Sequence, residues 1–139
     1  MSRQAPAVRI RLVLVDDHPV VREGLRTLFS EESDIELVGE GRNVEEAVRL
    51  VSSRKPDVVL LDLMMPGGDS IEGIRRIRAL RPAPQVVVLT SFGDESRVRA
   101  ALEAGAIGYL LKDVLRDDLV RAIRSAALGQ PTLDPTAQK

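Results

Sequence analysis

The chain has 139 residues, of which 44% are hydrophobic and 29% charged, as is typical of one globular domain. Its 20 basic residues nearly balance its 21 acidic residues, so the net charge gives no indication of binding to nucleic acid or to an anionic membrane. The absence of cysteine excludes thiol chemistry, the single histidine excludes histidine-rich metal sites, and the 2% of aromatic residues argues against a stacking platform for bases or flavins.

The apolar residues predict five strands, each followed by a helix. In chain order, the strand and helix of each unit are 10–15 and 20–29, 35–39 and 44–51, 58–61 and 71–80, 86–89 and 98–104, and 107–111 and 115–126. Asn43 and Asp94 stand at N-cap positions, and Pro56 and Pro82 follow predicted helix ends. The first, third and fourth strands are nearly continuous apolar runs, which favours a parallel sheet covered by helices on both faces.

The two ends of the chain differ in character from the segment between them. Residues 1–8 are expected to form a flexible leader, 9–128 one domain, and 129–139, with a glycine and two prolines, a linker. No apolar run approaches the ~20 residues of a membrane span, and the N-terminus has no signal-peptide core. We therefore expect a cytoplasmic protein without a membrane partner.

Polar side chains follow four of the predicted strands. Asp16 and Asp17 follow the first strand, Asp62 the third, Thr90 ends the fourth and Lys112 follows the fifth. Because ligands of parallel sheets bind at the carboxyl ends of the strands, we expect these groups to converge. Three carboxylates that repel one another favour Mg²⁺, and a lysine with a hydroxyl suits phosphoryl oxygens. The sequence predicts a Mg²⁺-assisted phosphoryl acceptor with Asp62 as the nucleophile.

Four motifs stand in order at the ends of these strands. They are VLVDDH at 13–18, LLDLMMPG at 60–67, VLTSF at 88–92 and AGAIGYLLK at 104–112. With them the chain, over roughly residues 9–128, resembles the receiver domain of two-component response regulators. The resemblance is strongest to receivers that precede a LuxR/NarL-type helix-turn-helix. It implies an α/β, flavodoxin-like (βα)5 fold with the strand order 2-1-3-4-5.

The resemblance also implies a role for each site residue. Asp62 would accept the phosphoryl group from a sensor histidine kinase. Mg²⁺ would bind directly to Asp17, Asp62 and the backbone carbonyl of Met64, and partly through water to Asp16. Lys112 would pair with the phosphoryl oxygens.

The implied switch involves two further roles. Thr90 would move inward to the phosphoryl group, and Tyr109 would fill the space that it leaves. The surface of the fourth helix, fifth strand and fifth helix would change as a result. On this interpretation the chain is a signalling switch and not an enzyme, apart from self-phosphorylation and self-dephosphorylation.

The fifth helix carries more apolar residues than one contact with the sheet needs. Because members of the resembled family often dimerise through this helix, the resemblance implies a phosphorylation-promoted homodimer. The expected interface consists of Leu115, Leu119, Ile123 and Ala127. DNA would be bound only by a helix-turn-helix domain beyond Lys139, to which the segment 129–139 would lead. The alternative within the same chemistry is a stand-alone receiver that signals by protein docking.

Several simpler interpretations remain open. A flavodoxin-type electron carrier would share the strand order, but this chain has no hydroxyl- and glycine-rich phosphate loop after the first strand. A haloacid-dehalogenase-type phosphohydrolase would share the Mg²⁺ chemistry, but this chain has neither its Asp-x-Asp motif nor its cap insertion. Asp16 or Asp17 could cap the first helix, Tyr109 could be ordinary packed surface, and His18 is expected to be a loop residue rather than a ligand. Asp113 stands where many receivers have proline, so the preceding peptide bond is expected to be trans or a strained exception, and Gly68 is expected to loosen its loop.

Overall fold

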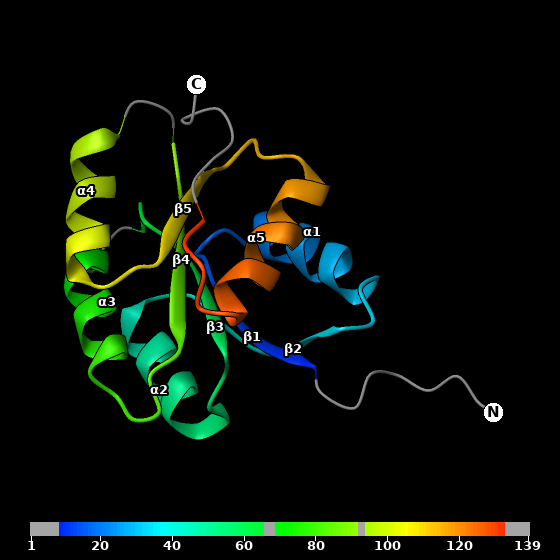
Figure 1. Cartoon of the computed structure of the whole chain (residues 1–139), viewed down its shortest axis with the longest axis horizontal. Helices are drawn as coiled ribbons and strands as arrows, with labels where there is room; N and C mark the ends of the chain where they lie inside the picture. Colours follow the sequence, from blue (N-terminus) through cyan, green and yellow to red (C-terminus); the bar gives the residue numbers. More distant parts are fainter. Residues whose placement is uncertain (1–8, 66–68, 92–93, 133–139) are drawn as a thin grey trace.

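Five parallel strands form one sheet in the computed structural model, which describes residues 9–65, 69–91 and 94–132. The strands are β1 (Ile10–Val15), β2 (Ile35–Gly41), β3 (Val58–Asp62), β4 (Gln85–Thr90) and β5 (Gly108–Leu111). Their order is β2-β1-β3-β4-β5, which confirms the predicted fold (Figure 1). The expected leader at 1–8, Gly68 and most of the expected linker, 133–139, lie outside the described residues.

Three strands extend further than their apolar runs: β2, which reaches Gly41, and β3 and β4. Asp62 is the last residue of β3 and Thr90 the last of β4, because backbone pairing continues past the apolar side chains. Asp62 pairs with Leu89 of β4, and Thr90 pairs with Leu111 of β5. The two polar side chains are therefore held by the sheet itself, at its carboxyl edge.

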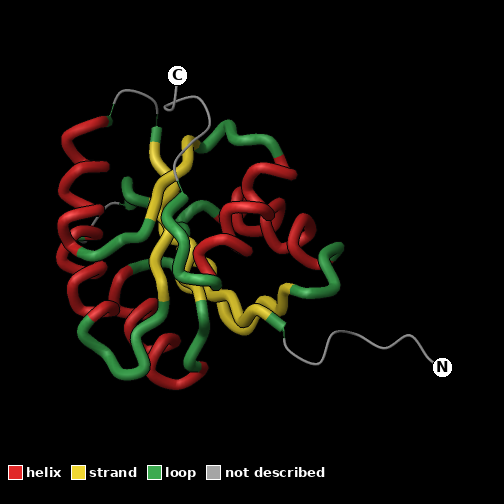
Figure 2. Tube along the Cα trace, in the orientation of Figure 1, coloured by secondary structure: helices red, strands yellow, loops and turns green. Residues whose placement is uncertain are grey.

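Helices cover both faces of the sheet (Figure 2). They are α1 (Pro19–Ser30), α2 (Val44–Arg54), α3 (Ser70–Arg78), α4 (Glu95–Ala104) and α5 (Arg116–Ala127). The apolar residues of α2, α3 and α4 pack on one face, here called the α2–α4 layer, and those of α1 and α5 on the other, the α1–α5 layer. Figure 1 shows α3 and α4 on the left of the sheet, and α1 and α5 on its right.

The central strands supply side chains to both layers. In β1, Val13 and Val15 belong to the α2–α4 layer, whereas Leu12 and Leu14 belong to the α1–α5 layer. All four side chains are at most 1% exposed. Burial on both faces explains why this strand is a continuous apolar run.

The helix caps agree only in part with the sequence. The side chain of Asn43 accepts a hydrogen bond from the backbone N–H of Glu46, as expected of an N-cap. Asp94 stands at the N-cap position of α4, but its side chain makes no capping hydrogen bond and lies 3.9 Å from Arg97 instead. Asp69, which the sequence reasoning missed, caps α3 through the backbone N–H groups of the first helical turn.

The segment after α5 returns to the sheet. Thr132 forms a parallel bridge with Gly108, and its carbonyl accepts a hydrogen bond from the backbone N–H of Tyr109 at 3.0 Å. A Cβ atom on Gly108 would overlap this carbonyl, so the close approach requires glycine. Residues 129–132, which the sequence assigned to a linker, therefore cover the outer edge of β5.

The expected dimer residues divide into two groups. Leu119 is 3% exposed and Ile123 0%, because both pack into the α1–α5 layer. Their assignment to a dimer interface was wrong, since burial in the core of the protomer leaves no surface for a partner. Leu115, at the N-cap of α5, is 72% exposed, and Ala127 is half-buried.

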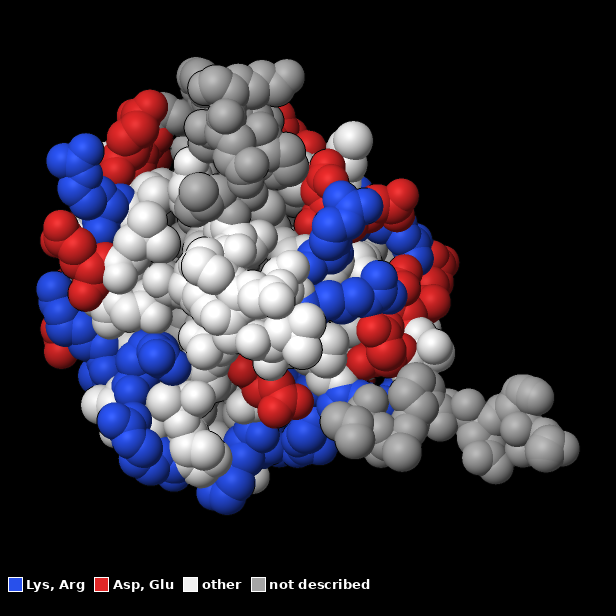
Figure 3. Space-filling model, viewed as in Figure 1, with Lys and Arg blue, Asp and Glu red and all other residues white. Residues whose placement is uncertain are grey.

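Charged side chains are distributed unevenly over the surface. Figure 3 shows Lys and Arg side chains at the lower rim and mixed charges on the side of α1 and α5, whereas the middle of this face carries few charges. In the part of the chain that the structure describes, no helix combines the length and apolar character of a membrane span.

Candidate functional site

Three carboxylates meet at the carboxyl edge of the sheet. Asp16 and Asp17 follow β1, and Asp62 ends β3. The side chains of Asp16 and Asp62 are buried, whereas that of Asp17 is 25% exposed. Ligand atoms of these residues and of His18 all lie within 4.8 Å of one another. The convergence expected from the sequence is thus present, with one histidine added to it.

Hydrogen bonds fix the loop between β1 and α1. The backbone N–H of Asp16 donates to the carbonyl of Gly41 in β2, and its Oδ1 accepts from the backbone N–H of His18 at 2.8 Å. The guanidinium of Arg22 donates to the Asp16 carbonyl at 2.6 Å. His18, not either aspartate, occupies the N-cap position of α1, so the capping interpretation of Asp16 and Asp17 is wrong.

Arg22 is a residue that the sequence reasoning missed. Helical spacing placed it on the outward face of its helix, yet its side chain is only 15% exposed. It reaches from α1 to the Asp16 carbonyl, and it also lies 3.7 Å from the Glu40 carboxylate. Arg22 stands three positions after α1 begins, and a basic residue there carries no sequence signal that separates this role from that of a solvated side chain.

Asp62 is held through one of its two carboxylate oxygens. Its Oδ1 accepts a hydrogen bond from the backbone N–H of Met64 at 3.0 Å and lies 3.1 Å from the Lys112 ammonium. The backbone N–H of Lys112 in turn donates to the carbonyl of Thr90, which continues the pairing of β4 and β5. The geometry fixes the direction of the Asp62 side chain and places Met64 beside it.

Three buried carboxylate oxygens, one from each aspartate, make no hydrogen bond within the described residues. Among the described residues, Oδ2 of Asp16 and Oδ2 of Asp62 are buried without a hydrogen bond. Burial of an ionised oxygen in that position costs free energy, because the oxygen has lost its hydrogen bonds to water and no protein hydrogen bond replaces them. Oxygen atoms of this kind, gathered from three carboxylates, fit a hard cation such as Mg²⁺ that keeps part of its water shell.

Thr90 and Tyr109 lie on the same face of the sheet. Val88 pairs with Tyr109, and Thr90 follows Val88 by two positions, so its side chain points to the same side. Thr90 is buried, and its hydroxyl finds no hydrogen-bond partner in the described parts of the chain. Tyr109 is half-buried against the α2–α4 layer. The two residues predicted as a switching pair are thus diagonal neighbours.

The peptide bond after Lys112 is trans. Within the described ranges the one cis bond is Arg81–Pro82, so Lys112–Asp113 is an ordinary peptide bond. This agrees with the first of the two expectations, because a cis bond before a residue other than proline costs about 3–4 kcal/mol.

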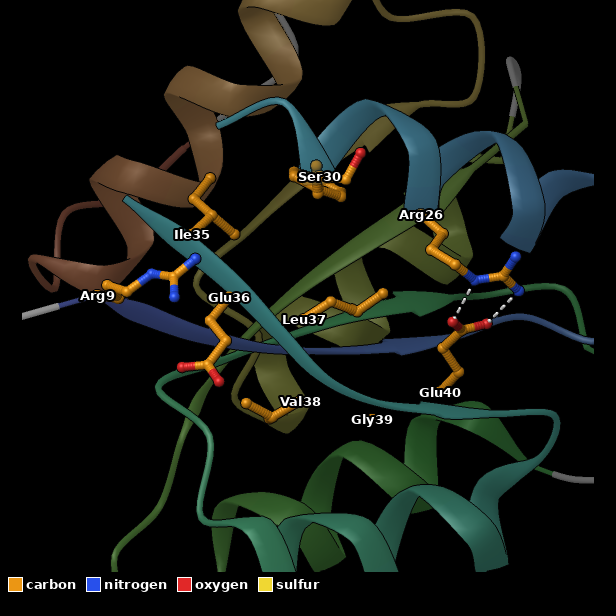
Figure 4. Close-up of a pocket in the computed structure, with 10 residues that line it drawn as sticks. Arg9, Arg26, Ser30, Ile35, Glu36, Leu37, Val38, Gly39 and Glu40 are labelled. Atoms are coloured by element: carbon orange, nitrogen blue, oxygen red, sulfur yellow. Dashed lines mark hydrogen bonds and ion pairs between the residues drawn. The ribbon is translucent and has the colours of Figure 1, made fainter. Parts of the chain in front are cut away.

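A groove of about 570 Å³ lies elsewhere, along the outer edge of β2 and beside α1 (Figure 4). None of the acidic site residues lines it. Arg26 donates two hydrogen bonds across it to Glu40, at 2.7 and 3.0 Å. These bonds hold the pKa of Glu40 below its usual range, against the opposing effect of burial.

Comparisons with known proteins agree with this geometry. The family model described as the response regulator receiver domain matches residues 12–124. The chain is 43% identical over 125 residues to the transcriptional regulatory protein LiaR of Bacillus subtilis, covering 90% of this chain and 59% of LiaR. It is 41% identical over 133 residues to the nitrate/nitrite response regulator protein NarL of Escherichia coli, covering 96% of this chain and 60% of NarL.

Solved structures show the same arrangement. A two-component response regulator of the LuxR family from Aurantimonas superposes with a TM-score of 0.87 at 37% identity, with 94% of each chain covered. The isolated REC domain of RcsB from Salmonella enterica, solved with the phosphomimetic BeF3⁻, gives a TM-score of 0.83 at 26% identity, covering 94% of this chain and 96% of that one. The chain spans about three fifths of the curated relatives that it matches.

Proposed function

This chain belongs to the family of response regulator receiver domains, and on that basis we propose that it is a signalling switch in which Asp62 accepts a phosphoryl group. One observation carries the proposal. Asp62 is buried with its Oδ1 held by Lys112 and Met64, while its Oδ2 has no hydrogen-bond partner among the described residues and lies beside two further carboxylates. A carboxylate oriented in this way is ready to act as a nucleophile toward phosphorus.

The proposed transfer comes from the phosphohistidine of a sensor kinase. A bond forms between an Asp62 oxygen and phosphorus while the bond from phosphorus to the imidazole nitrogen breaks, and the electron pair leaves with the imidazole. Lys112 stabilises the charge on the phosphoryl oxygens through its ammonium group. The chain is itself the acceptor, so we propose no enzymatic role beyond its own phosphorylation and dephosphorylation.

The residues of the pocket fit the Mg²⁺ ion that this chemistry uses. Asp16, Asp17, Asp62 and the Met64 carbonyl would hold it. When bound, the ion supplies positive charge to the phosphoryl oxygens during transfer. In its absence the same carboxylates repel one another and an incoming phosphoryl group, so transfer is expected to depend on Mg²⁺.

The proposed switch uses Thr90 and Tyr109, which are diagonal neighbours on one face of the sheet. The Thr90 hydroxyl, which lacks a partner, would donate to the phosphoryl group, and Tyr109 would then move toward the space it leaves. The added charge of about −1.5 to −2 is the driving force. The surface formed by α4, β5 and α5 changes, and with it the tendency to form a homodimer.

The wider role follows from the relatives. LiaR and NarL are named as regulators, and one neighbouring structure is described as two RcsB dimers bound to two parallel DNAs. We propose that this receiver controls a DNA-binding domain in the same way, in the cytoplasm and in response to a histidine kinase. Sedimentation at tens of micromolar tests the dimer, since phosphorylated and free protein must then differ in mass.

The chemistry is tested with a small acyl-phosphate donor and intact-mass measurement. We expect one phosphoryl group per chain with Mg²⁺, little with a chelator present, and loss of the label in hydroxylamine, which cleaves acyl phosphates. A label that forms equally well under chelation, or that survives hydroxylamine, contradicts the proposal.

A further inference from the structure

The single histidine of the chain belongs to the acidic cluster of Asp16, Asp17 and Asp62. Nδ1 of His18 is 3.2 Å from Oδ1 of Asp16 and 3.2 Å from Oδ1 of Asp17. The histidine side chain is 58% exposed, so an ion can reach it from solvent. The sequence predicted a loop residue here rather than a ligand, because the residue type alone does not show which way the imidazole turns.

The spacing of these atoms is that of ligands to one ion. Two ligand atoms that are each about 2.0–2.2 Å from a metal ion lie about 2.8–3.6 Å apart, for angles between octahedral and tetrahedral. Both distances from His18 Nδ1, to Oδ1 of Asp16 and to Oδ1 of Asp17, meet this condition without movement. The ligand atoms of the whole group lie within 4.8 Å of one another, so small shifts of the side chains are enough to place all three around one metal ion.

A second observation points to a ligand in the same place. Oδ2 of Asp16 and Oδ2 of Asp62 are buried, belong to residues that are 1% exposed, and have no hydrogen-bond partner in the described chain. Both residues belong to the same group of ligand atoms as His18. The pocket therefore offers one nitrogen and several oxygens to a cation, not oxygens alone.

We propose that His18 is a nitrogen ligand, through Nδ1, which allows this pocket to bind a borderline divalent transition metal such as Zn²⁺ in addition to Mg²⁺. The inference rests on the proposed metal role of Asp16 and Asp17, but it does not require phosphorylation. Imidazole binds Zn²⁺ well and Mg²⁺ poorly, because Mg²⁺ prefers oxygen ligands and retains its water. The absence of cysteine leaves the protein no thiolate that would compete for the metal.

The consequence is competition for one site. A transition metal held by the histidine and the two aspartates occupies the position from which Mg²⁺ would assist phosphoryl transfer. Transition metals bind such ligands more tightly than Mg²⁺ does. The fraction of the receiver that carries Mg²⁺ then depends on the free concentration of both ions.

Calorimetric titration of wild-type protein and His18→Ala, with Zn²⁺ and with Mg²⁺, is the first test. Loss of even an outer-shell partner costs a metal site about 10–100-fold in affinity, so we expect the variant to lose Zn²⁺ affinity at least about tenfold more than it loses Mg²⁺ affinity. Asp17→Asn is the matched control and should weaken both ions. Equal losses for the two ions in His18→Ala contradict nitrogen ligation and reduce His18 to an electrostatic neighbour.

Nitrogen NMR of wild-type protein is the second test and needs no variant. With ¹⁵N-labelled histidine the imidazole gives one pair of signals, because the chain has one histidine. We expect Zn²⁺ to shift the Nδ1 signal as bonding to the metal does, and Mg²⁺ to leave it close to its free position. A response at Nε2 alone, or none, overturns the proposal. The phosphoryl-acceptor function is untouched by that outcome, since its own test uses Mg²⁺ and Asp62.

Discussion

The Lys112 ammonium lies 3.1 Å from Oδ1 of Asp62 and leaves Oδ2 of the same carboxylate without a partner among the described residues. The one positive charge thus occupies only one of the two oxygens of Asp62. Lys112 owes its position to the pairing of β4 with β5, because its backbone N–H donates to Thr90. Asp62 is thus oriented through Oδ1, which leaves Oδ2 for the proposed reaction.

Replacement of Lys112 by alanine should separate metal binding from phosphorylation. We expect phosphorylation by a small donor to fall roughly 100-fold, the cost of losing one charge-stabilising donor in comparable sites. Mg²⁺ affinity should rise about fivefold, since unit charges about 4 Å apart repel by about 1 kcal/mol even in water. Calorimetry and phosphorylation rates on the same samples measure the two effects.

Lys112→Arg is the matched control, because it keeps the charge and changes the geometry. Its Mg²⁺ affinity should remain near that of the wild type. If Lys112→Ala lowers Mg²⁺ affinity and phosphorylation together, the lysine supports the fold of the pocket and does not act on the phosphoryl group.

Gly108→Ala should release the segment after α5 from the sheet. The added Cβ would collide with the Thr132 carbonyl, which accepts the hydrogen bond of the Tyr109 backbone N–H. We expect amide hydrogen exchange at Tyr109 to accelerate while the interior of β4 stays protected. Unchanged exchange at Tyr109 would show that the segment tolerates the methyl group or does not shield this amide.

Gly24→Ala serves as the control for a glycine with free space. Nothing lies within 4 Å of a Cβ at this exposed position in the middle of α1. Alanine there should raise the free energy of unfolding by roughly 0.5–1 kcal/mol through helix propensity alone. It should leave exchange at Tyr109 as in the wild type.

Replacement of Ile123 and replacement of Leu115 by alanine should differ strongly in their effect on the free energy of unfolding. Ile123 is fully buried in the α1–α5 layer, so Ile123→Ala should lower the free energy of unfolding by about 2–5 kcal/mol. Leu115 is 72% exposed, so Leu115→Ala should change it by less than about 0.5 kcal/mol. Urea denaturation measures both, and similar losses would refute the placement of α5.

Glu40 should stabilise the fold only above acidic pH. The hydrogen bonds from Arg26 hold the pKa of Glu40 below its value in the unfolded chain. The contribution is therefore complete above the ordinary glutamate pKa and disappears as the pH falls through the lower pKa of the folded state. Because both side chains are partly exposed, we expect no more than about 1 kcal/mol.

The comparison of wild-type protein with Glu40→Gln tests this direction of the pH dependence of stability. The difference in free energy of unfolding should be present at about pH 7 and shrink on acidification, as the pH falls through the lowered pKa of the folded state. A difference that grows on acidification would contradict it.

The sequence predicted the fold well because its strongest signals are periodic. Continuous apolar runs such as 10–15 are what burial on both faces of a sheet requires, and the helices between them show the matching spacing. The strand ends were less predictable. Asp62 and Thr90 belong to strands because backbone pairing, not side-chain polarity, sets the end of a ladder.

The site was predictable where chain position alone brings groups together. Asp16, Asp62 and Lys112 stand at strand ends, and parallel strands carry such residues to one edge of the sheet. Side-chain direction was not predictable in this way. Arg22 turns back to the Asp16 carbonyl and His18 turns toward the carboxylates. The spacing of residues in the sequence indicates neither direction.

The surface of α5 was the least predictable feature. Leu119 and Ile123 share a helical face with Leu115, so an apolar stripe alone does not show how deep each residue lies. The apolar residues within the helix pack on the sheet, whereas Leu115 at its N-cap and Leu128 at its C-cap stay exposed. The return of Thr132 to β5 depends on a long-range contact that no local pattern encodes.

The most direct test of the account is phosphorylation of Asp62→Asn beside Asp118→Asn, with a small phosphodonor and Mg²⁺. Asparagine keeps the size of the side chain but removes the nucleophilic carboxylate, whereas Asp118 lies on the outer face of α5, paired with Arg121. We predict that wild type and Asp118→Asn each carry one phosphoryl group by intact mass and that Asp62→Asn carries none. A label retained by Asp62→Asn at the wild-type level would contradict the assignment of the acceptor.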